Sequence, residues 1–446
     1  MKYIALTIGP IYDTIFNTLN VDKKTKKLKA GSYYFSLFMK TMLKNIKEDF
    51  EILVPYVGED ALTRESKTMG LFHDRFIAQS EKSKSEIKDI FLEKEKKTFK
   101  ELAQIISNES IVTELRKNMT NHYVIASREE LQEIDENVIF ALNKILDAKE
   151  LQRNFSLNKE KNWIEIYQEN EIENSKVKTI EDLSSKLGFD YYAVITADGD
   201  KMGAKIKEKA TVNPENIKEL SQNLYNFFTK NNDIYHITNK EFSGELIYAG
   251  GDDILAFLPV KNGDKTFLDY IHILDERFKE FVGNDVSLSF GVNIAFYKYP
   301  LRNAIQSAFD LLHEAKEDKN IKNRISLKIT KHSGQWFKST LCLQDERYDV
   351  YKNLVDGVLE NKITLPHSLH HSLKRYEEAI LSIYKYENSS VKAMFDTVFN
   401  DATENDKKGI ELVQKYIDII KPQTNFEFDS IFSELSIIKF LRGDRK

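Results

Sequence analysis

Short apolar runs of strand length alternate along the chain with longer stretches of amphipathic pattern. The strand-length runs lie at residues 3–8, 51–57, 191–196, 246–249 and 254–258. The last two flank Gly250-Gly251-Asp252-Asp253, and glycine tolerates the left-handed backbone that a tight turn needs. We therefore expect a β-hairpin with two aspartates at its tip.

Apolar residues at three- and four-residue spacing predict helices in much of the remaining chain. The expected helices lie at residues 11–19, 32–46, 87–106, 131–151, 163–170, 219–230, 267–281, 301–316, 346–359, 368–386, 390–400, 409–420 and 430–441. Ser32 is a suitable cap for one of them, and Pro300 suits the start of another. The buried stripe of the helix after Pro300 is expected at Ala304, Ala308, Leu311 and Ala315. The pattern divides the chain into mixed segments at 1–80 and 188–338 and helical segments at 81–187 and 339–446.

A second acidic motif directly follows one of the apolar strands. Residues 197–203 read ADGDKMG, which places Asp198 and Asp200 in the loop after the strand. They converge with Asp252 and Asp253 if the two strands are neighbours in one sheet. The repulsion between adjacent carboxylates has to be offset, and magnesium takes one or two carboxylates plus substrate phosphates. The alternatives to a metal site are that the hairpin is a solvated turn and that the second motif is an acidic loop after a buried strand.

Divalent ions held at such a place indicate a class of chemistry. Two metals serve phosphoryl or nucleotidyl transfer, one activating the attacking hydroxyl and the other neutralising the triphosphate. Gly199 and Gly203 keep side chains away from the place where phosphates would lie. The helical pattern that follows offers its N-terminus to the same phosphates.

Composition sets limits on the class of protein. The 446 residues include 41% hydrophobic and 30% charged residues, and no apolar run reaches the ~20 residues needed to span a membrane. The start MKYIALTIGPIYD does not match a secretory signal. A single cysteine, Cys342, excludes an internal disulfide framework and a multi-cysteine zinc site, so we expect a cytoplasmic protein. The formal charge of −5 gives no overall attraction to nucleic acid, so RNA contacts would need local basic faces or partner subunits.

Three ordered sequence blocks resemble a known family. ADGDKMG at 197–203, YAGGDD at 248–253 and the block at 288–329 are similar to the second palm domain of the large subunit of type III CRISPR effector complexes, Cmr-type. That family is a relative of the GGDEF-type cyclases. Ile8-Gly9-Pro10, Ala30-Gly31-Ser32 and Arg75-Phe76 resemble its first palm more loosely.

The resemblance implies a fold and an arrangement of domains. The implied class is α+β, with two ferredoxin-like palm domains, an inserted helical domain at 81–187 and a C-terminal helical bundle at 339–446. The first palm would occupy 1–80 and be completed by later segments, and the second would occupy 188–338. An HD-type nuclease, which many relatives carry, is expected to be absent, because His73 is the first histidine of this chain. The four cysteines of the family's zinc ribbon are also missing.

The resemblance also implies an activity. Asp198, Asp252 and Asp253 would be the catalytic residues and would hold Mg²⁺ or Mn²⁺. The residues expected to bind ATP are Gly199, Asp200, Gly203, Gly250, Gly251 and Lys316. The 3′-hydroxyl of an acceptor would attack the α-phosphate, giving a cyclic oligoadenylate when target RNA pairs with CRISPR RNA in a complex with other subunits.

Three alternatives to this activity remain open. The same site can join AMP to another acceptor, such as S-adenosylmethionine. The chain can instead be a stand-alone cyclase that makes a dinucleotide, or a non-catalytic scaffold that binds RNA and subunits. Two individual residues also have two interpretations. Ser221 matches a serine of the family, and Lys316 matches the lysine that binds phosphate in the family, but each can instead be an ordinary solvent-exposed residue.

Overall fold

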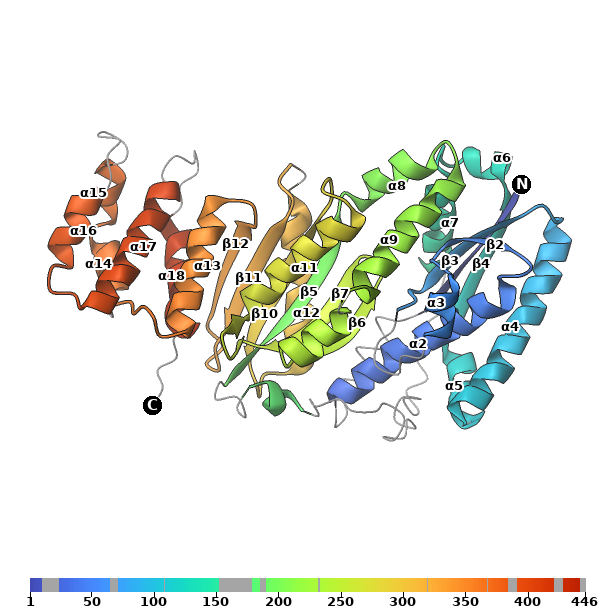
Figure 1. The fold of residues 1–446 in the computed structure, drawn as a ribbon, viewed down its shortest axis with the longest axis horizontal. Coiled ribbons are helices and arrows are strands. Elements are labelled where there is room, and N and C mark those ends of the chain that lie inside the picture. Colours follow the sequence, from blue (N-terminus) through green and yellow to red (C-terminus); the bar gives the residue numbers. More distant parts are fainter. Residues whose placement is uncertain are drawn as a thin grey trace. The chain divides into compact units, whose positions relative to one another are not determined.

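The chain, in a computed structural model, divides into two compact units (Figure 1). The structure describes residues 1–9, 24–64, 71–107, 109–151, 179–184, 190–231, 233–318, 320–366, 368–383, 391–420 and 428–441. Unit 1 comprises Met1–Leu183, Lys201–Phe257 and Asp275–Ser287, and unit 2 comprises Ser184–Asp200, Leu258–Leu274 and Leu288–Lys446. The expected helices at 11–19 and 163–170 lie outside the described residues. The two units do not test the finer division of the chain into four segments that the sequence suggests, so that division remains a prediction.

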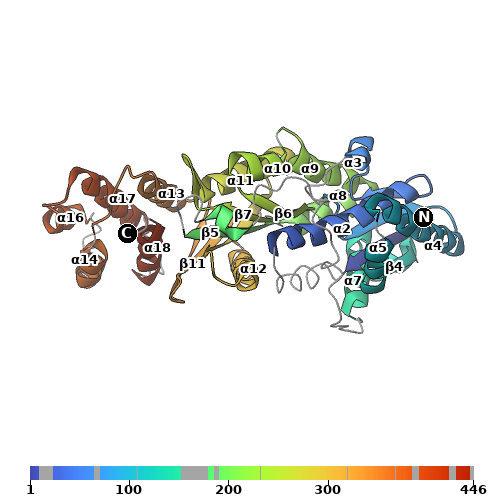
Figure 2. The ribbon, with the colours of Figure 1, turned by 90° about the horizontal axis from the view of Figure 1, so that it is seen from below.

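A four-stranded antiparallel sheet forms the first part of unit 1. It contains β1 (Lys2–Gly9), β2 (Glu51–Val54), β3 (Arg75–Ser80) and β4 (Thr120–Ser127) in the order β2-β3-β1-β4. Helices α2 (Lys24–Ile46) and α4 (Lys84–Ile106) connect β1 to β2 and β3 to β4, and they pack on each other (Figures 1 and 2). This β-α-β-β-α-β order is the ferredoxin-like motif. The expected α+β class with a ferredoxin-like sheet is therefore confirmed.

Two elements of this motif differ from the sequence expectation. Helix α2 begins at Lys24 rather than at Ser32, because straight-chain lysines are good helix formers and Leu28 is buried. Strand β4 lies within the segment expected to be helical throughout. It pairs with β1 over its whole length, and its centre, Tyr123-Val124-Ile125, has the aromatic and β-branched side chains that suit a strand.

The rest of unit 1 places helices and a hairpin beside this motif. Its further elements are α3 (Glu59–Thr63), α5 (Glu109–Asn118), α6 (Arg128–Gln132), α7 (Val138–Leu151), α8 (Met202–Ala210), α9 (Ile217–Thr229), α10 (Ile234–His236), β6 (Glu245–Gly250) and β7 (Asp253–Pro259). Ser83 and Ser127 each begin a helix with a reciprocal capping box, which satisfies backbone N–H groups of the first turn.

Four longer strands of unit 2 lie side by side in the order β12-β11-β10-β5. They are β5 (Tyr191–Asp200), β10 (Ser287–Phe296), β11 (Arg324–Thr330) and β12 (Trp336–Cys342). Strands β10 and β11 are parallel, and α12 (Leu301–Glu317) connects them. All four residues of the stripe predicted for this helix are buried. The helix crosses β10 so closely that a Cβ on Gly291 would lie 2.1 Å from the carbonyl oxygen of Ala308.

Helices make up the C-terminal part of unit 2. One short strand pair and a helix precede them, with bounds β8 (Lys261–Asn262), β9 (Lys265–Thr266) and α11 (Phe267–Val282). The C-terminal helices are α13 (Glu346–Leu359), α14 (Leu369–Arg375), α15 (Glu377–Ser382), α16 (Lys392–Val398), α17 (Glu404–Ile420) and α18 (Phe428–Leu441). The helix expected at 368–386 is divided at Tyr376 into α14 and α15. In the described part of the chain no helix is both long and apolar enough to cross a membrane.

Candidate functional site

The predicted acidic hairpin is present in unit 1. Strands β6 and β7 pair up to Gly250 and Asp253, which leaves Gly251 and Asp252 as a two-residue turn. Gly251 has a φ of 68°, as required at the first central position of a type II′ turn. The sequence interpretation of this stretch is thus confirmed.

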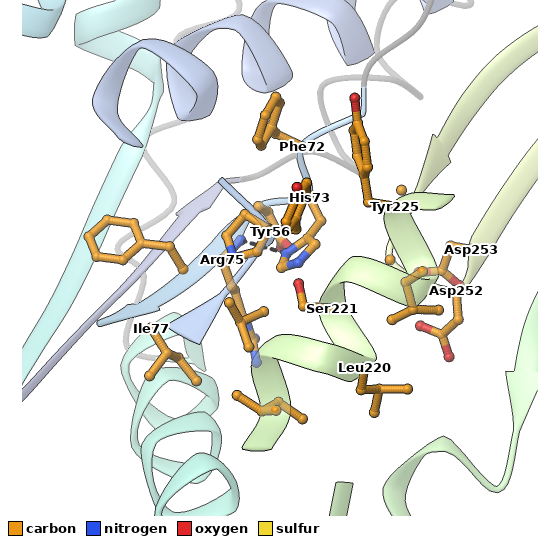
Figure 3. A pocket seen from close by; sticks show the side chains of 18 of the residues that line it. Tyr56, Phe72, His73, Arg75, Ile77, Leu220, Ser221, Tyr225, Asp252 and Asp253 are labelled. Atoms are coloured by element: carbon orange, nitrogen blue, oxygen red, sulfur yellow. Dashed lines mark hydrogen bonds between the residues drawn. The ribbon is translucent and has the colours of Figure 1, made fainter. Parts of the chain in front are cut away.

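This turn lies at a cavity of about 410 Å³ within unit 1 (Figure 3). One wall is formed by residues 54–56 at the end of β2 and by 71–77, which lead into β3. A second wall comes from α7, α8 and α9, and a third from Tyr248 and residues 250–253 of the hairpin. Segments distant in the sequence therefore enclose one space, as expected for a ligand-binding pocket.

Polar groups lie in a mostly apolar lining. His73, Asp74, Ser221, Asp252 and Asp253 all contribute to the wall. Figure 3 shows His73 and Ser221 near the centre of the view and the two aspartates to their right. Ser221 is only 8% exposed, so the alternative of a solvent-exposed serine is wrong.

Burial determines the charge states around His73. It lowers the pKa of His73, whose Nδ1 accepts the backbone N–H of Arg75 at 3.3 Å, and so favours a neutral imidazole. Burial raises the pKa of Asp74. The guanidinium of Arg75 is bound by Asp147 at 2.6 Å and Glu150 at 3.2 Å, so its charge is already paired.

The carboxylates at and near the hairpin affect the pKa of Tyr248. Its pKa is raised well above the ordinary value of 10.0, first by burial and then by the charges of Asp253, Asp74 and Asp252. The phenol therefore stays protonated and can donate a hydrogen bond, which in the structure goes to the carbonyl of Gly250 at 3.4 Å. Three carboxylates thus act on a single hydroxyl group.

The donor set at the hairpin fits a divalent cation with oxygen ligands. Asp252 and Asp253 are adjacent carboxylates at a cavity wall, which is the minimal protein contribution that Mg²⁺ needs when substrate phosphates complete its shell. In the described ranges, no group of three or more His, Cys, Asp or Glu side chains is arranged to hold a metal ion. The two hairpin carboxylates fit an ion whose remaining ligands come from substrate phosphates.

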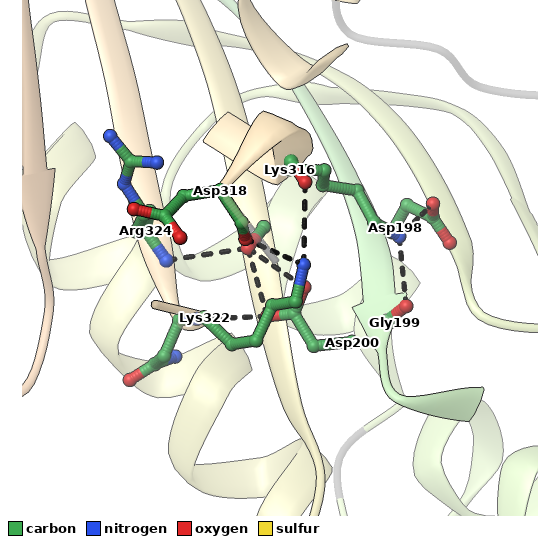
Figure 4. A network of polar contacts seen from close by, with 9 residues as sticks. Asp198, Gly199, Asp200, Lys316, Asp318, Lys322 and Arg324 are labelled. Atoms are coloured by element: carbon green, nitrogen blue, oxygen red, sulfur yellow. Dashed lines mark hydrogen bonds and ion pairs between the residues drawn. The ribbon is translucent and has the colours of Figure 1, made fainter. Parts of the chain in front are cut away.

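The second acidic motif belongs to unit 2, at the end of β5 (Figure 4). Asp198 forms an ion pair with Lys316, which α12 presents in its last turn. The same ammonium donates to the carbonyl oxygen of Gly199 at 2.9 Å. Lys322 in turn donates to the carbonyl oxygens of Lys316 at 3.3 Å and Asp318 at 2.9 Å. The Asp198 carboxylate is thus already paired with the ammonium group of Lys316.

Asp200 is buried beneath this surface. It is 1% exposed and accepts hydrogen bonds from the Ser289 hydroxyl at 2.8 and 3.0 Å and from the backbone N–H of Asn323 at 2.9 Å. Its contacts tie the end of β5 to β10 and to the residue that precedes β11. In this position Asp200 supports the strand end that carries Asp198.

The predicted site residues therefore form two groups. Gly250, Gly251, Asp252 and Asp253 line the cavity of unit 1, and Gly203 lies in α8 of the same unit. Asp198, Gly199, Asp200 and Lys316 cluster in unit 2. The expected convergence of Asp198 with the hairpin aspartates joins residues of different units and remains a prediction.

Several cavity residues were not singled out as site residues from the sequence. In the sequence analysis His73 serves only as evidence against an HD-type nuclease, and Tyr248 only as the first residue of the YAGGDD block. The available signal was the segment GLFHDRF, in which polar groups immediately precede strand β3.

Comparisons with known proteins agree with these observations. The chain is 31% identical over 225 residues to the CRISPR system Cmr subunit Cmr2 of Pyrococcus furiosus, a match that covers 43% of this chain and 25% of that protein. The chain thus matches about a quarter of the length of that curated relative. Residues 191–326 match the family model described as Cas10/Cmr2, second palm domain.

Solved structures show a similar fold. A chain of type III-B Cmr-beta in the apo state aligns with a TM-score of 0.59 and 12% identity, covering 99% of this chain and 82% of that one. A chain of the Csm1–Csm4 cassette in complex with cA4 aligns with a TM-score of 0.55 and 14% identity, covering 99% and 69%. The resemblance seen in the motifs is confirmed, and residues 191–326 are related to the second palm domain of the Cas10/Cmr2 family.

Proposed function

We propose that the chain is the nucleotidyltransferase subunit of an RNA-guided type III CRISPR complex and makes a cyclic oligoadenylate from ATP when target RNA binds. The observation that carries this proposal is the pair Asp252-Asp253, held by a tight turn at the wall of a largely apolar cavity. The structural relatives add support, since one was solved with cA4 and Cmr-beta was also solved bound to cognate target RNA.

The cavity has the features that a nucleoside requires. Its apolar walls can cover a base and ribose, and the rings of Tyr56 and Tyr225, with centroids 5.1 Å apart, give an aromatic surface on one side. The Ser221 hydroxyl is a donor and acceptor within the same wall. The triphosphate would then extend towards the hairpin aspartates.

The chain's own groups would position the reacting atoms. Asp252 and Asp253, with Asp198, would hold Mg²⁺ or Mn²⁺, and the bound ions would neutralise the triphosphate and lower the pKa of the attacking 3′-hydroxyl. Lys316 would bind phosphate oxygens from the last turn of α12. The apolar walls would exclude water, which favours attack by the acceptor hydroxyl over hydrolysis.

Product analysis by mass spectrometry tests this function. The purified complex with guide RNA is incubated with target RNA, ATP and Mg²⁺ or Mn²⁺, with and without S-adenosylmethionine. The variant Asp252→Asn/Asp253→Asn removes two charges while keeping the side-chain shapes. The matched control, Glu377→Gln/Glu378→Gln, makes the same change in charge at the start of α15.

The expected result is an adenylate product that falls about a hundredfold or more in the hairpin variant and is unchanged in the control, because the lost charges stabilise the transition state. The product mass identifies the acceptor. Undiminished product in the hairpin variant would contradict the assignment of the site. No product from a complex that still binds RNA would indicate a scaffold.

A further inference from the structure

The C-terminal helices of unit 2 carry a group of lysine, arginine and histidine side chains that the proposed catalytic function does not use. Helix α14 contributes His370, His371, Lys374 and Arg375. Residues three and four positions apart share a face of a helix, so His371, Lys374 and Arg375 lie together, with His370 beside Lys374. His371, Lys374 and Arg375 are exposed, and His370 is half-buried.

Helix α18 adds a lysine and an aromatic ring. It packs on α14 (Figure 1), and the Phe432 ring lies 4.9 Å from the ring of His370. Lys439 follows Phe432 by two helical turns and therefore projects from the same face. We call His370, His371, Lys374, Arg375 and Lys439 the α14–α18 patch.

Basic side chains surround His370 within the patch. The pKa of His370 is lowered first by burial and then by Lys439, His371 and Lys374. The next helix begins with Glu377 and Glu378. Within the described ranges, no ion pair joins any cation of the patch to an acid.

The surface continues towards the turn between β11 and β12. Lys331, just after β11, lies 4.7 Å from the ring centroid of Phe337 and 5.7 Å from that of Phe440, the residue after Lys439. Cations and aromatic rings therefore alternate across this part of unit 2. In a chain with a formal charge of −5, such a concentration of positive charge is local.

We propose that the α14–α18 patch binds single-stranded RNA. Lys374, Arg375 and Lys439 would contact successive phosphates, which attract protein cations and release counterions on binding. The neighbouring rings of His370 and Phe432, which are tilted by 60° to each other, would offer an aromatic face to an unpaired base, as aromatic side chains do in proteins that bind single strands. An acidic protein segment would form ion pairs with the basic side chains but would have no base to pack on the aromatic rings, so RNA matches the patch better.

Fluorescence anisotropy with the full-length chain tests this surface. The probe is a short fluorescein-labelled single-stranded RNA of mixed sequence, titrated over a series of salt concentrations. The test variant is Lys374→Glu/Lys439→Glu. The matched control is Lys407→Glu/Lys408→Glu, which makes the same charge change at two exposed positions of α17. Circular dichroism verifies that both variants are folded.

The expected result is a loss of at least about tenfold in affinity for the test variant at low salt. The slope of log affinity against log salt should fall by about 1.4, since each lost phosphate contact on a single strand contributes about 0.7. The variant Lys374→Arg/Lys439→Arg should retain binding. Asp252→Asn/Asp253→Asn should bind RNA normally, which separates this inference from the proposed catalytic function.

Two outcomes would overturn the inference. An equal loss of affinity in the α17 control would mean that overall charge, rather than the patch, determines binding. Binding of labelled polyglutamate at the patch, without binding of RNA, would assign the surface to an acidic protein partner.

Discussion

Removing the hydroxyl group of Ser289 should destabilise unit 2 more than the same change at a neighbouring buried serine. Ser289 lies in β10, is fully buried, and donates to the carboxylate of Asp200 at 2.8 and 3.0 Å. Its oxygen also accepts the backbone N–H of Arg324 at 3.3 Å. The substitution Ser289→Ala therefore deprives a buried carboxylate of one of its donors.

The magnitude follows from the nature of the acceptor. A hydrogen bond to a charged group contributes about 1.5–3 kcal/mol to stability, and the weaker contact from Arg324 adds at most about 1 kcal/mol. We expect a loss of roughly 2–4 kcal/mol. Ser326, in the adjacent strand β11, is also fully buried, but among the described residues its hydroxyl bonds only the hydroxyl of Thr340 at 2.8 Å. The change Ser326→Ala should cost about 1 kcal/mol.

The assay is native-state hydrogen exchange of the full-length chain, combined with thermal unfolding. Exchange reports the free energy of local opening at the Asn323 and Arg324 amides, which donate to Asp200 and Ser289. Both amides should exchange faster in Ser289→Ala than in Ser326→Ala. Equal losses in the two variants, or unchanged protection of these amides, would refute the view that Asp200 acts as a buried anchor of the strand end.

Two further predictions concern packing and pH dependence in unit 2. The substitution Gly291→Ala should lower the free energy of unfolding by about 1–3 kcal/mol, because the new Cβ would meet the backbone of Ala308 and α12 would have to shift. An unchanged melting temperature would contradict this close approach of α12 to β10. Burial raises the pKa of Asp269, but hydrogen bonds from Lys352 and from Thr266 outweigh it and hold the pKa below the ordinary 3.8. The stability that these interactions with the ionised Asp269 contribute is present above pH 3.8 and is lost as pH falls through the lowered pKa. The variant Asp269→Asn should therefore have a lower melting temperature at neutral pH, and its melting temperature should fall less on acidification. Parallel pH profiles of the melting temperature in the variant and the parent chain would disprove this.

Local patterns were sufficient to predict the acidic hairpin and the buried face of α12. In the hairpin, two apolar runs flank a glycine whose φ is positive, so turn chemistry and strand pattern agree. In α12, the small and apolar residues recur at helical spacing, and the same period places them against the sheet. In both features the pattern that made the prediction possible lies within a short stretch of sequence.

The cavity and the ion pair of Asp198 depend on residues far apart in the sequence. His73 and Gly251 are close enough that a Cβ on Gly251 would lie 3.8 Å from the imidazole ring, although 178 positions separate them. No periodicity of either segment indicates this contact. The strand β4 was missed for a related reason, because its stability comes from pairing with β1 rather than from its charged surroundings.

The strand order of the first sheet has a consequence for synthesis of the chain. Strand β1 emerges first from the ribosome, yet its neighbours in the finished sheet are β3 and β4 rather than β2. At usual elongation rates, β4 follows β1 after on the order of 10 s. Throughout that interval the apolar strand 3–8 lacks its second neighbour, so one of its edges stays open to pairing with other chains.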